Sequence, residues 1–221
     1  LLDSDFYDYI VIDEAHHSQA DSYRKLFDHF QPQLLVGLTA TPERMDGKDL
    51  RPDFGNRISA EIRLPQALQA GLLTPFQYLC ISDDTDLSDD SLWSGQKYNI
   101  ERLADKLCAK TRARLIVDAL HKYLADEYTC RALCFCVNKR HADFMAEQLR
   151  LYGFNAQSLT SDTPADERKH HAKDLREGTL HYLCVVDIFN EGVDIPEVDT
   201  VLFLRPTESL TIFLQQLGRG L

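Results

Sequence analysis

The sequence predicts an α/β protein whose sheets are mainly parallel. Short apolar runs of strand length alternate with segments of helical period, and the runs are almost continuously apolar, as in parallel sheets that helices cover on both faces. A strand followed by a helix, repeated along the chain, is the pattern of this fold class. The expected strands are residues 9–12, 34–38, 133–137, 180–186 and 201–204.

Two of the expected helices have recognisable ends. Asn138 is placed to cap a helix that Gly153 closes. The apolar face of this helix is formed by Ala142, Met145, Leu149 and Tyr152. The other helix runs over residues 164–177, with a proline at its start and Gly178 after it, which is the usual placement of these two residue types at helix ends.

The composition fits an ordinary globular protein. The 221 residues suffice for one large domain or two modest ones, and the hydrophobic content is 44%. The net charge of -11 argues against a basic coat over the whole surface, but it leaves room for a local basic groove that binds nucleic acid. An acidic, turn-rich segment, residues 81–99, suggests a linker or an insertion. We therefore expect domains at residues 1–78 and 113–221, joined by residues 79–112.

Cysteine usage and hydropathy bear on the compartment. The six cysteines form no C-x-x-C pair and sit mostly in apolar runs, which predicts buried, reduced thiols and a cytoplasmic setting. No apolar run approaches the roughly 20 residues that a membrane span needs, and the first residues do not form a signal peptide. We expect no membrane partner.

An acid pair, Asp13 and Glu14, directly follows the first expected strand. Open α/β sheets bind their ligands at the carboxyl ends of their strands. One carboxylate there could hold Mg²⁺ through water, while its neighbour orients and deprotonates an attacking water. The alternatives are that an acid caps a helix starting at Ala15, or that His16 and His17 bind a metal, although H-E-x-x-H spacing is absent.

Longer motifs point to a known family. "VIDEAHH", followed after one short helix by "GLTATP", resembles motifs II and III of superfamily 2 helicases in their DEAD/DEAH-box arrangement. "ALCFCVN", "VVDIFNEGVDIPEVDTVLFLRP" and "QQLGRG" resemble motifs IV, V and the start of VI, in the same order. "TATPERMDG", "FNEGVDIPEVD" and "RPTESLTIFLQQLGRGL" are most similar to the branch related to type III restriction-enzyme motor subunits. The resemblance spans nearly the whole chain.

The resemblance implies two RecA-like domains with parallel sheets, the first incomplete at its N-terminus. ATP and Mg²⁺ would lie in the cleft between the domains, with nucleic acid, DNA rather than RNA, crossing both. Asp13 would coordinate Mg²⁺ through water, Glu14 would be the catalytic base, and His16 would link the nucleotide site to the nucleic-acid side. Thr39 and Thr41 would report the state of the acid pair. The alternative for these threonines is a hydroxyl-capped turn before a proline.

Further roles in the second half follow from the same resemblance. Gly192 would permit close backbone approach and Asp194 would meet a ribose hydroxyl, whereas the alternative is a simple turn. Arg219, with Gln215 one helical turn before it, would meet the γ-phosphate, and the alternative is a helix terminus. The candidates for contact with the phosphate backbone are Asn138, Thr160 and Arg205, and for each of them the alternative is a cap or a turn.

The sequence departs from the family pattern at both ends. It contains no G-x-x-x-x-G-K-[ST] loop to cradle phosphates. The pattern QxxGRxxR needs a second arginine beyond Leu221. We therefore expect a piece of a longer protein, which by itself hydrolyses essentially no ATP because positioning and phosphate electrostatics dominate this reaction.

The leading hypothesis is an ATP-dependent helicase or translocase, in which ATP hydrolysis opens and closes the cleft. An attached nuclease or other domains would lie outside these residues. One alternative is a nucleotide-dead module that binds nucleic acid or acts as a scaffold. Another is a metal-dependent hydrolase that uses Asp13, Glu14, His16 and His17 and binds Zn²⁺ or Mn²⁺.

Overall fold

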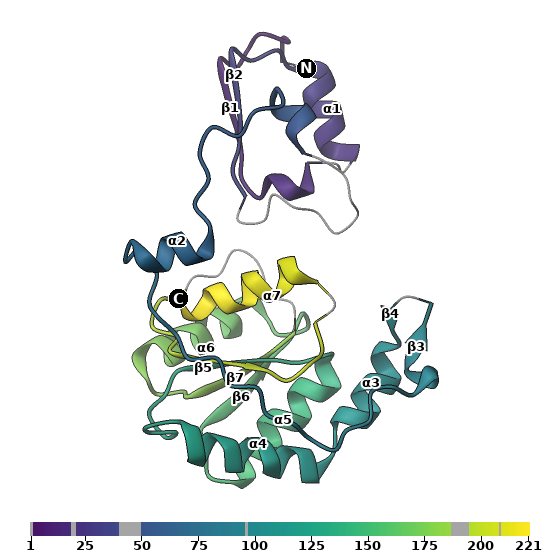
Figure 1. The fold of residues 1–221 in the computed structure, drawn as a ribbon, viewed down its shortest axis with the longest axis vertical. Helices are drawn as coiled ribbons and strands as arrows, with labels where there is room; N and C mark the ends of the chain where they lie inside the picture. Colours follow the sequence, from purple (N-terminus) through teal and green to yellow (C-terminus); the bar gives the residue numbers. More distant parts are fainter. Residues whose placement is uncertain (1, 19–20, 40–49, 96, 187–194, 208) are drawn as a thin grey trace. The chain divides into compact units, whose positions relative to one another are not determined.

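A computed structural model describes residues 2–18, 21–39, 50–95, 97–186, 195–207 and 209–221. The chain divides into two compact units, Leu1–Leu72 with Ser209–Leu214, and Leu73–Glu208 with Gln215–Leu221. Each unit contains parallel strands joined through helices (Figure 1). The predicted α/β class with parallel sheets is therefore confirmed.

The first unit is built on a pair of parallel strands. β1 (Tyr9–Ile12) pairs with β2 (Leu34–Gly37), and α1 (Asp21–His29) lies between them in the chain. A short 3₁₀ turn, Ala15–His17, follows β1. A second 3₁₀ turn, Arg51–Phe54, and α2 (Leu64–Gln69) follow in this unit, which also includes the first part of α7 (Leu210–Leu217).

The apolar run of β1 is not buried on both faces, contrary to the sequence-based expectation. Tyr9 is 68% and Val11 61% exposed, whereas Ile12 is 6% exposed. Tyr9 pairs with Leu34, which is 50% exposed, so one face of the strand pair is open in the part of the unit that the structure describes. The other face packs inward, and for this reason only alternate residues of the run are shielded.

The second unit holds a four-stranded parallel sheet in the order β6-β7-β5-β8. Its strands are β5 (Ala132–Phe135), β6 (Ala156–Leu159), β7 (Tyr182–Val185) and β8 (Thr200–Phe203). Every residue of the central strands β5 and β7 is buried, as continuous apolar runs predict. β6 was not foreseen, because "AQSL" places two adjacent polar residues between apolar ones and shows neither a continuous apolar run nor strict alternation.

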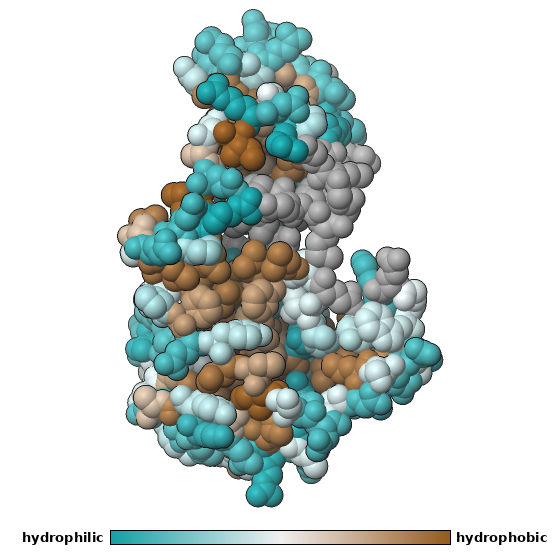
Figure 2. Space-filling model, viewed as in Figure 1, coloured by the Kyte–Doolittle hydropathy of each residue, from teal (hydrophilic) through white to brown (hydrophobic). Residues whose placement is uncertain are grey.

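Helices cover both faces of this sheet. One apolar cluster joins α4 (Lys110–Tyr123) and α5 (Lys139–Leu151) to the sheet, and a second includes Leu175 of α6 (Ala165–Glu177). α7 (Leu210–Leu217) continues into a 3₁₀ turn, Gly218–Gly220. Leu210 is 68% exposed, and Figure 2 shows apolar surface along α7.

The predicted helix ends are confirmed. The Asn138 Oδ1 atom accepts a hydrogen bond of 3.0 Å from the backbone N–H of His141 at the start of α5. Gly153 follows the end of α5 with φ 88°, and Gly178 ends α6 with φ 74°. Tyr152, which we expected on the buried face, is 40% exposed because it lies just past the last helical turn.

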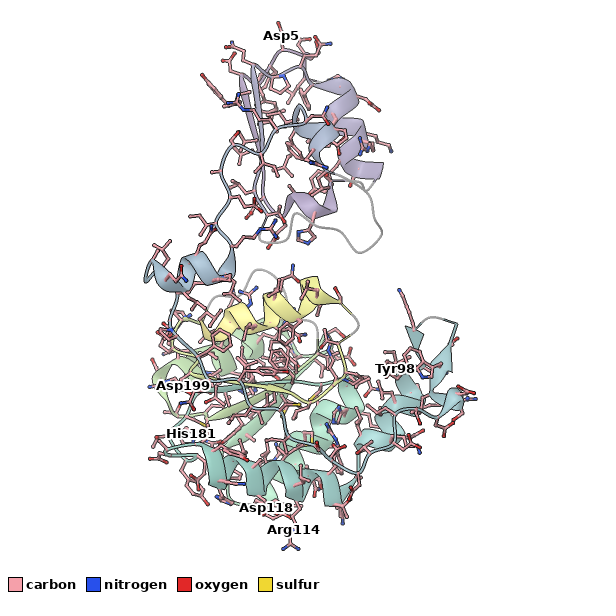
Figure 3. The ribbon with its side chains drawn as sticks, viewed as in Figure 1. Asp5, Tyr98, Arg114, Asp118, His181 and Asp199 are labelled. Atoms are coloured by element: carbon pink, nitrogen blue, oxygen red, sulfur yellow. The ribbon has the colours of Figure 1, made fainter. Side chains whose placement is uncertain are left out.

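The segment that we expected to be a linker or an insertion contains regular structure. A hairpin of β3 (Trp93–Ser94) and β4 (Lys97–Tyr98) leads into α3 (Ile100–Leu107). The Trp93 and Tyr98 rings stack with centroids 4.1 Å apart, and Figure 3 shows Tyr98 on this hairpin. The Arg112 Nε atom donates a hydrogen bond of 2.7 Å to Asp83 Oδ2, which fastens the acidic stretch to α4.

Four of the six cysteines are buried as free thiols, namely Cys130, Cys134, Cys136 and Cys184. Burial raises the pKa of Cys130 to about 11, so that its thiol is a packing group rather than a nucleophile. The expectation of burial fails for Cys80, which is exposed, and for Cys108, which is half-buried. Among the described residues, no helix combines the length and hydropathy that spanning a bilayer requires.

Acid is expected to weaken the second unit through His141, which is fully buried. Burial lowers the pKa of His141 to about 4, with help from Arg112 and Arg140. In the unfolded chain the His141 imidazole takes up a proton near pH 6.5, whereas in the folded chain it does so only near pH 4. The free energy of unfolding therefore falls as the pH drops from about 6.5 to about 4, by about 1.4 kcal/mol per pH unit.

The substitution His141→Asn retains an acceptor for the Val137 N–H, which now donates to His141 Nδ1. Denaturant unfolding at pH 7 and pH 5 can be followed through Trp93, the only tryptophan. Between these two pH values, we expect the free energy of unfolding to fall by about 2 kcal/mol more in the wild type than in the variant. Equal losses would show that His141 does not remain neutral in the folded state.

Candidate functional site

The carboxyl ends of β1 and β2 bring two predicted motifs together. Hydrogen bonding between the strands continues past their ends, because the Leu38 N–H donates to Ile12 O at 2.8 Å and the Ala15 N–H donates to Leu38 O at 2.8 Å. The segment that starts with the acid pair therefore runs beside the segment that leads to Thr39. Parallel pairing places the ends of both strands at one edge of the sheet, where ligands bind in this fold class.

His16 joins the two segments through its side chain. Its Nδ1 atom lies 3.3 Å from Glu14 Oε2 and 3.1 Å from Thr39 Oγ1. The imidazole is 10% exposed and the Glu14 side chain 38% exposed, so the ring is shielded while the carboxylate is open to solvent. One ring nitrogen that faces both a carboxylate and a hydroxyl can exchange hydrogen-bond partners when either group moves.

The acid pair has an unusual backbone. Glu14 has φ 49° and ψ 48°, the left-handed region, which costs a residue with a side chain roughly 1 kcal/mol or more. The Asp13 Oδ1 atom accepts a hydrogen bond of 2.9 Å from the Glu14 N–H. The Glu14 side chain makes no capping hydrogen bond to the turn Ala15–His17. The capping alternative therefore does not describe what Glu14 does here.

Some predicted site residues lie outside the described part of the chain. These are Thr41, Gly192 and Asp194, together with the side chain of His17. Their roles stay predictions. Within the described ranges, no group of three or more His, Cys, Asp or Glu side chains is arranged to hold a metal ion.

In the second unit, Asn138 and Thr160 both make local hydrogen bonds. Besides capping α5, Asn138 donates from Nδ2 to Glu101 Oε1 at 3.0 Å. It borders an open surface cavity of about 550 Å³ whose lining includes Lys139 and Arg140. Thr160 is 4% exposed, and its N–H donates to Thr163 Oγ1 at 3.0 Å in the turn after β6. Asn138 makes its hydrogen bonds through its side chain and Thr160 through its backbone N–H. The predicted contacts of both residues with nucleic acid stay predictions.

Arg205, Gln215 and Arg219 are all half-buried. Arg205 lies just beyond the end of β8. The turn that carries Arg219 packs against the same strand, since a Cβ atom on Gly220 would lie 3.0 Å from Val201 Cγ2. The guanidinium of Arg219 is therefore carried on a segment whose backbone is fixed by the sheet.

Three further residues near the end of β2 were not visible in the sequence. Arg24 of α1 makes two hydrogen bonds to the Asp53 carboxylate, at 2.7 and 2.9 Å. The neighbouring Phe54 ring lies against Gly37 at the end of β2. The only signal in the sequence was a glycine placed within a strand, which often marks close approach of another group.

Comparison with known proteins agrees with the motifs. Residues 91–221 match the family described as helicase conserved C-terminal domain, and residues 1–44 match the type III restriction enzyme res subunit. The chain belongs to the superfamily 2 helicases. It is related to the branch that contains restriction-enzyme motor subunits.

Individual relatives are similar to nearly the whole of this helicase chain. It is 30% identical to "Putative ATP-dependent helicase IRC3" of Saccharomyces cerevisiae, over 96% of this chain and 31% of the yeast protein. It is 26% identical to the type I restriction enzyme EcoKI endonuclease subunit of Escherichia coli, over 97% of this chain and 22% of that subunit.

A solved structure, "The fragment structure of a putative HsdR subunit of a type I restriction enzyme from Vibrio vulnificus YJ016", is similar with a TM-score of 0.69 and 26% identity. The match covers 99% of this chain and 41% of that one. The chain thus spans less than half the length of each of these relatives. Family membership supports RecA-like domains with parallel sheets.

Removing the α5 cap is expected to destabilise the second unit modestly. Asn138→Ala deletes the acceptor for the His141 N–H and should lower the free energy of unfolding by about 1 kcal/mol. Asn138→Asp keeps that acceptor, but it deletes the amide donor to Glu101 Oε1 and adds a negative charge beside that carboxylate, so it should recover stability only in part. If Asn138 also contacts phosphate, Asn138→Asp weakens nucleic-acid binding. If both variants bind nucleic acid as the wild type does, the only role of Asn138 is to cap α5.

Proposed function

We propose that this chain carries motifs II to V and the start of motif VI of an ATP-dependent motor that moves along nucleic acid, DNA rather than RNA. The observation that carries the proposal is that His16 lies within hydrogen-bonding reach of both Glu14 and Thr39, which follow two different strands. Such a group can connect the state of a nucleotide to the rest of the domain. The DNA preference rests on the kinship with subunits of restriction enzymes.

The acid pair suits a magnesium nucleotide. Asp13 is exposed at a strand end and presents hard oxygen ligands, which Mg²⁺ prefers, directly or through water. Bound there, the ion would neutralise charge on the phosphates. Glu14 would accept a proton from the attacking water, since its carboxylate is open to solvent while His16 holds one of its oxygens.

The remaining candidates complete the proposal. Arg219, with Gln215 before it, would stabilise charge that develops on the γ-phosphate. Gly192 would permit close backbone approach to the nucleotide, and Asp194 would bind a ribose hydroxyl. The proposed contacts with the nucleic-acid backbone are Asn138, Thr160 and Arg205. We also propose a reducing, cytoplasmic setting, which the buried free thiols support.

The 221 residues by themselves should hydrolyse ATP poorly. They contain no loop of the G-x-x-x-x-G-K-[ST] type, and phosphoryl transfer depends on such groups to hold the phosphates. Activity therefore has to be tested in the complete gene product that carries this chain.

The deciding experiment is ATP turnover by that gene product, alone and with single-stranded DNA, duplex DNA or RNA. We expect turnover to rise with DNA more than with RNA. Stimulation by RNA alone would overturn the preference for DNA. No turnover with any nucleic acid would contradict the motor and favour a nucleotide-dead binding or scaffolding module.

A further inference from the structure

The end of β2 passes the ring of Phe54 at a distance that only glycine permits. A Cβ atom on Gly37 would lie 2.7 Å from Phe54 Cζ, 2.8 Å from Phe54 Cε1 and 3.0 Å from Ala15 Cβ. Gly37 lies in a strand and is not among the glycines with positive φ. Close packing, rather than backbone freedom, therefore requires glycine at this position.

The ring of Phe54 is itself held in place from α1. The neighbouring Asp53 side chain is only 9% exposed, and its two carboxylate oxygens accept hydrogen bonds of 2.7 and 2.9 Å from the two Nη atoms of Arg24. A paired, planar contact of this kind fixes orientation as well as distance. Phe27, also of α1, packs edge-on against Phe54 with ring centroids 6.1 Å apart at 81°.

Phe54 lies against Gly37, and Gly37 in turn adjoins Ala15 of the other backbone segment that carries the candidate site. Ala15 stands between Glu14 and His16 in the chain, and it is 2% exposed. Gly37 and Leu38 lead directly to Thr39, and the Ala15 N–H donates to Leu38 O. Any shift of the turn Ala15–His17 relative to Gly37 would change the distance from His16 Nδ1 to Thr39 Oγ1.

We infer that Phe54, held by the Arg24–Asp53 pair, is a positioning residue that sets the geometry of the Glu14, His16 and Thr39 side chains. The inference rests on the proposed function. A smaller side chain at position 54 leaves space beside Gly37, next to Ala15, into which the turn can move. The left-handed backbone of Glu14 persists only while its surroundings hold it, so it should respond to the loss of that support. Misplacement of reacting groups by about 1 Å can slow a reaction by about 10²-fold.

The first test uses Phe54→Leu in the complete gene product, measured as kcat and KM for ATP with saturating DNA. We expect kcat to fall about tenfold or more with KM nearly unchanged, because the substitution misplaces reacting groups without touching nucleotide. The matched control is Phe30→Leu, which removes a ring that packs 5.2 Å from Tyr7 in the same unit. The control should lower stability without lowering kcat of the folded protein.

A second test asks whether the lost volume can be restored. Gly37→Ala places a methyl group against the Phe54 ring and should lower both stability and kcat. In the double variant, Phe54→Leu leaves room for the methyl group that Gly37→Ala adds. That methyl group in turn fills part of the space that the lost ring leaves. We expect kcat of the double variant to exceed that of either single variant. Asp53→Asn, which keeps its shape and weakens the ion pair, should lower kcat in the same direction if Phe54→Leu does not fold.

The outcomes separate this inference from the proposed function. Absence of turnover in the wild type would overturn both. Normal wild-type turnover with kcat of Phe54→Leu and Asp53→Asn no lower than that of Phe30→Leu would overturn the positioning role alone. A double variant no faster than Gly37→Ala would also overturn it.

Discussion

Glutamine in place of Glu14 should lower ATP turnover by the complete gene product about 10²- to 10⁴-fold while ATP binding and folding persist. The substitution deletes a base that accepts a proton in the transition state, and it keeps the size of the side chain. The open carboxylate beside His16 is the group that this change removes. Turnover at saturating DNA and ATP affinity measured separately would check the expectation.

The matched control for this substitution is Glu167→Gln, an exposed carboxyl in the first turn of α6. Its turnover should equal that of the wild type. Wild-type turnover in Glu14→Gln would remove Glu14 from the mechanism. A large loss of stability in Glu14→Gln would instead make Glu14 a structural residue of the left-handed turn.

Removal of the guanidinium in Arg219→Ala should lower ATP turnover by about 10³-fold or more with a near-normal melting temperature. Arginine stabilises charge on the transferring phosphoryl group through its planar set of donors. Arg219→Lys should not restore the rate, because an ammonium lacks this fork. Turnover and thermal unfolding measured on the same preparations would separate catalysis from folding.

A control arginine lies on the surface of the second unit. Arg114 of α4 is 73% exposed and faces Asp118 one helical turn away at 3.9 Å (Figure 3). Arg114→Ala should leave turnover unchanged, because exposed pairs of this kind contribute little. A large drop in melting temperature for Arg219→Ala would favour the alternative that Arg219 serves only to end α7.

The candidate site could be predicted in part from the sequence. The acid pair after β1 and the threonine after β2 were visible as polar residues that follow apolar runs. That His16 stands between Glu14 and Thr39 was not visible, because the contact joins residues far apart in the chain through a side-chain rotamer. The Arg24–Asp53 pair was missed for the same reason, since neither residue belongs to a recognisable pattern.

The second unit shows where periodicity succeeds and where it fails. β5 and β7 were predicted because both faces of each are covered, which leaves a continuous apolar run. β6 escaped because an edge strand has a weaker pattern, and the β3–β4 hairpin escaped because two-residue strands show no period. The exposure of β1 could not be foreseen, since an apolar run does not tell which of its faces another element covers.

By itself the sequence determined the α/β class, most of the parallel strands, the helix caps at Asn138 and Gly178, and the helicase family. These features depend on local periodicity, on backbone conformations that particular residues favour, and on ordered motifs, all of which are written along the chain. Only the tertiary structure decided that His16 bridges two strand ends, that the backbone of Glu14 is in the left-handed region, and that the Phe54 ring packs against Gly37. Those features depend on packing between distant segments, which no local pattern encodes.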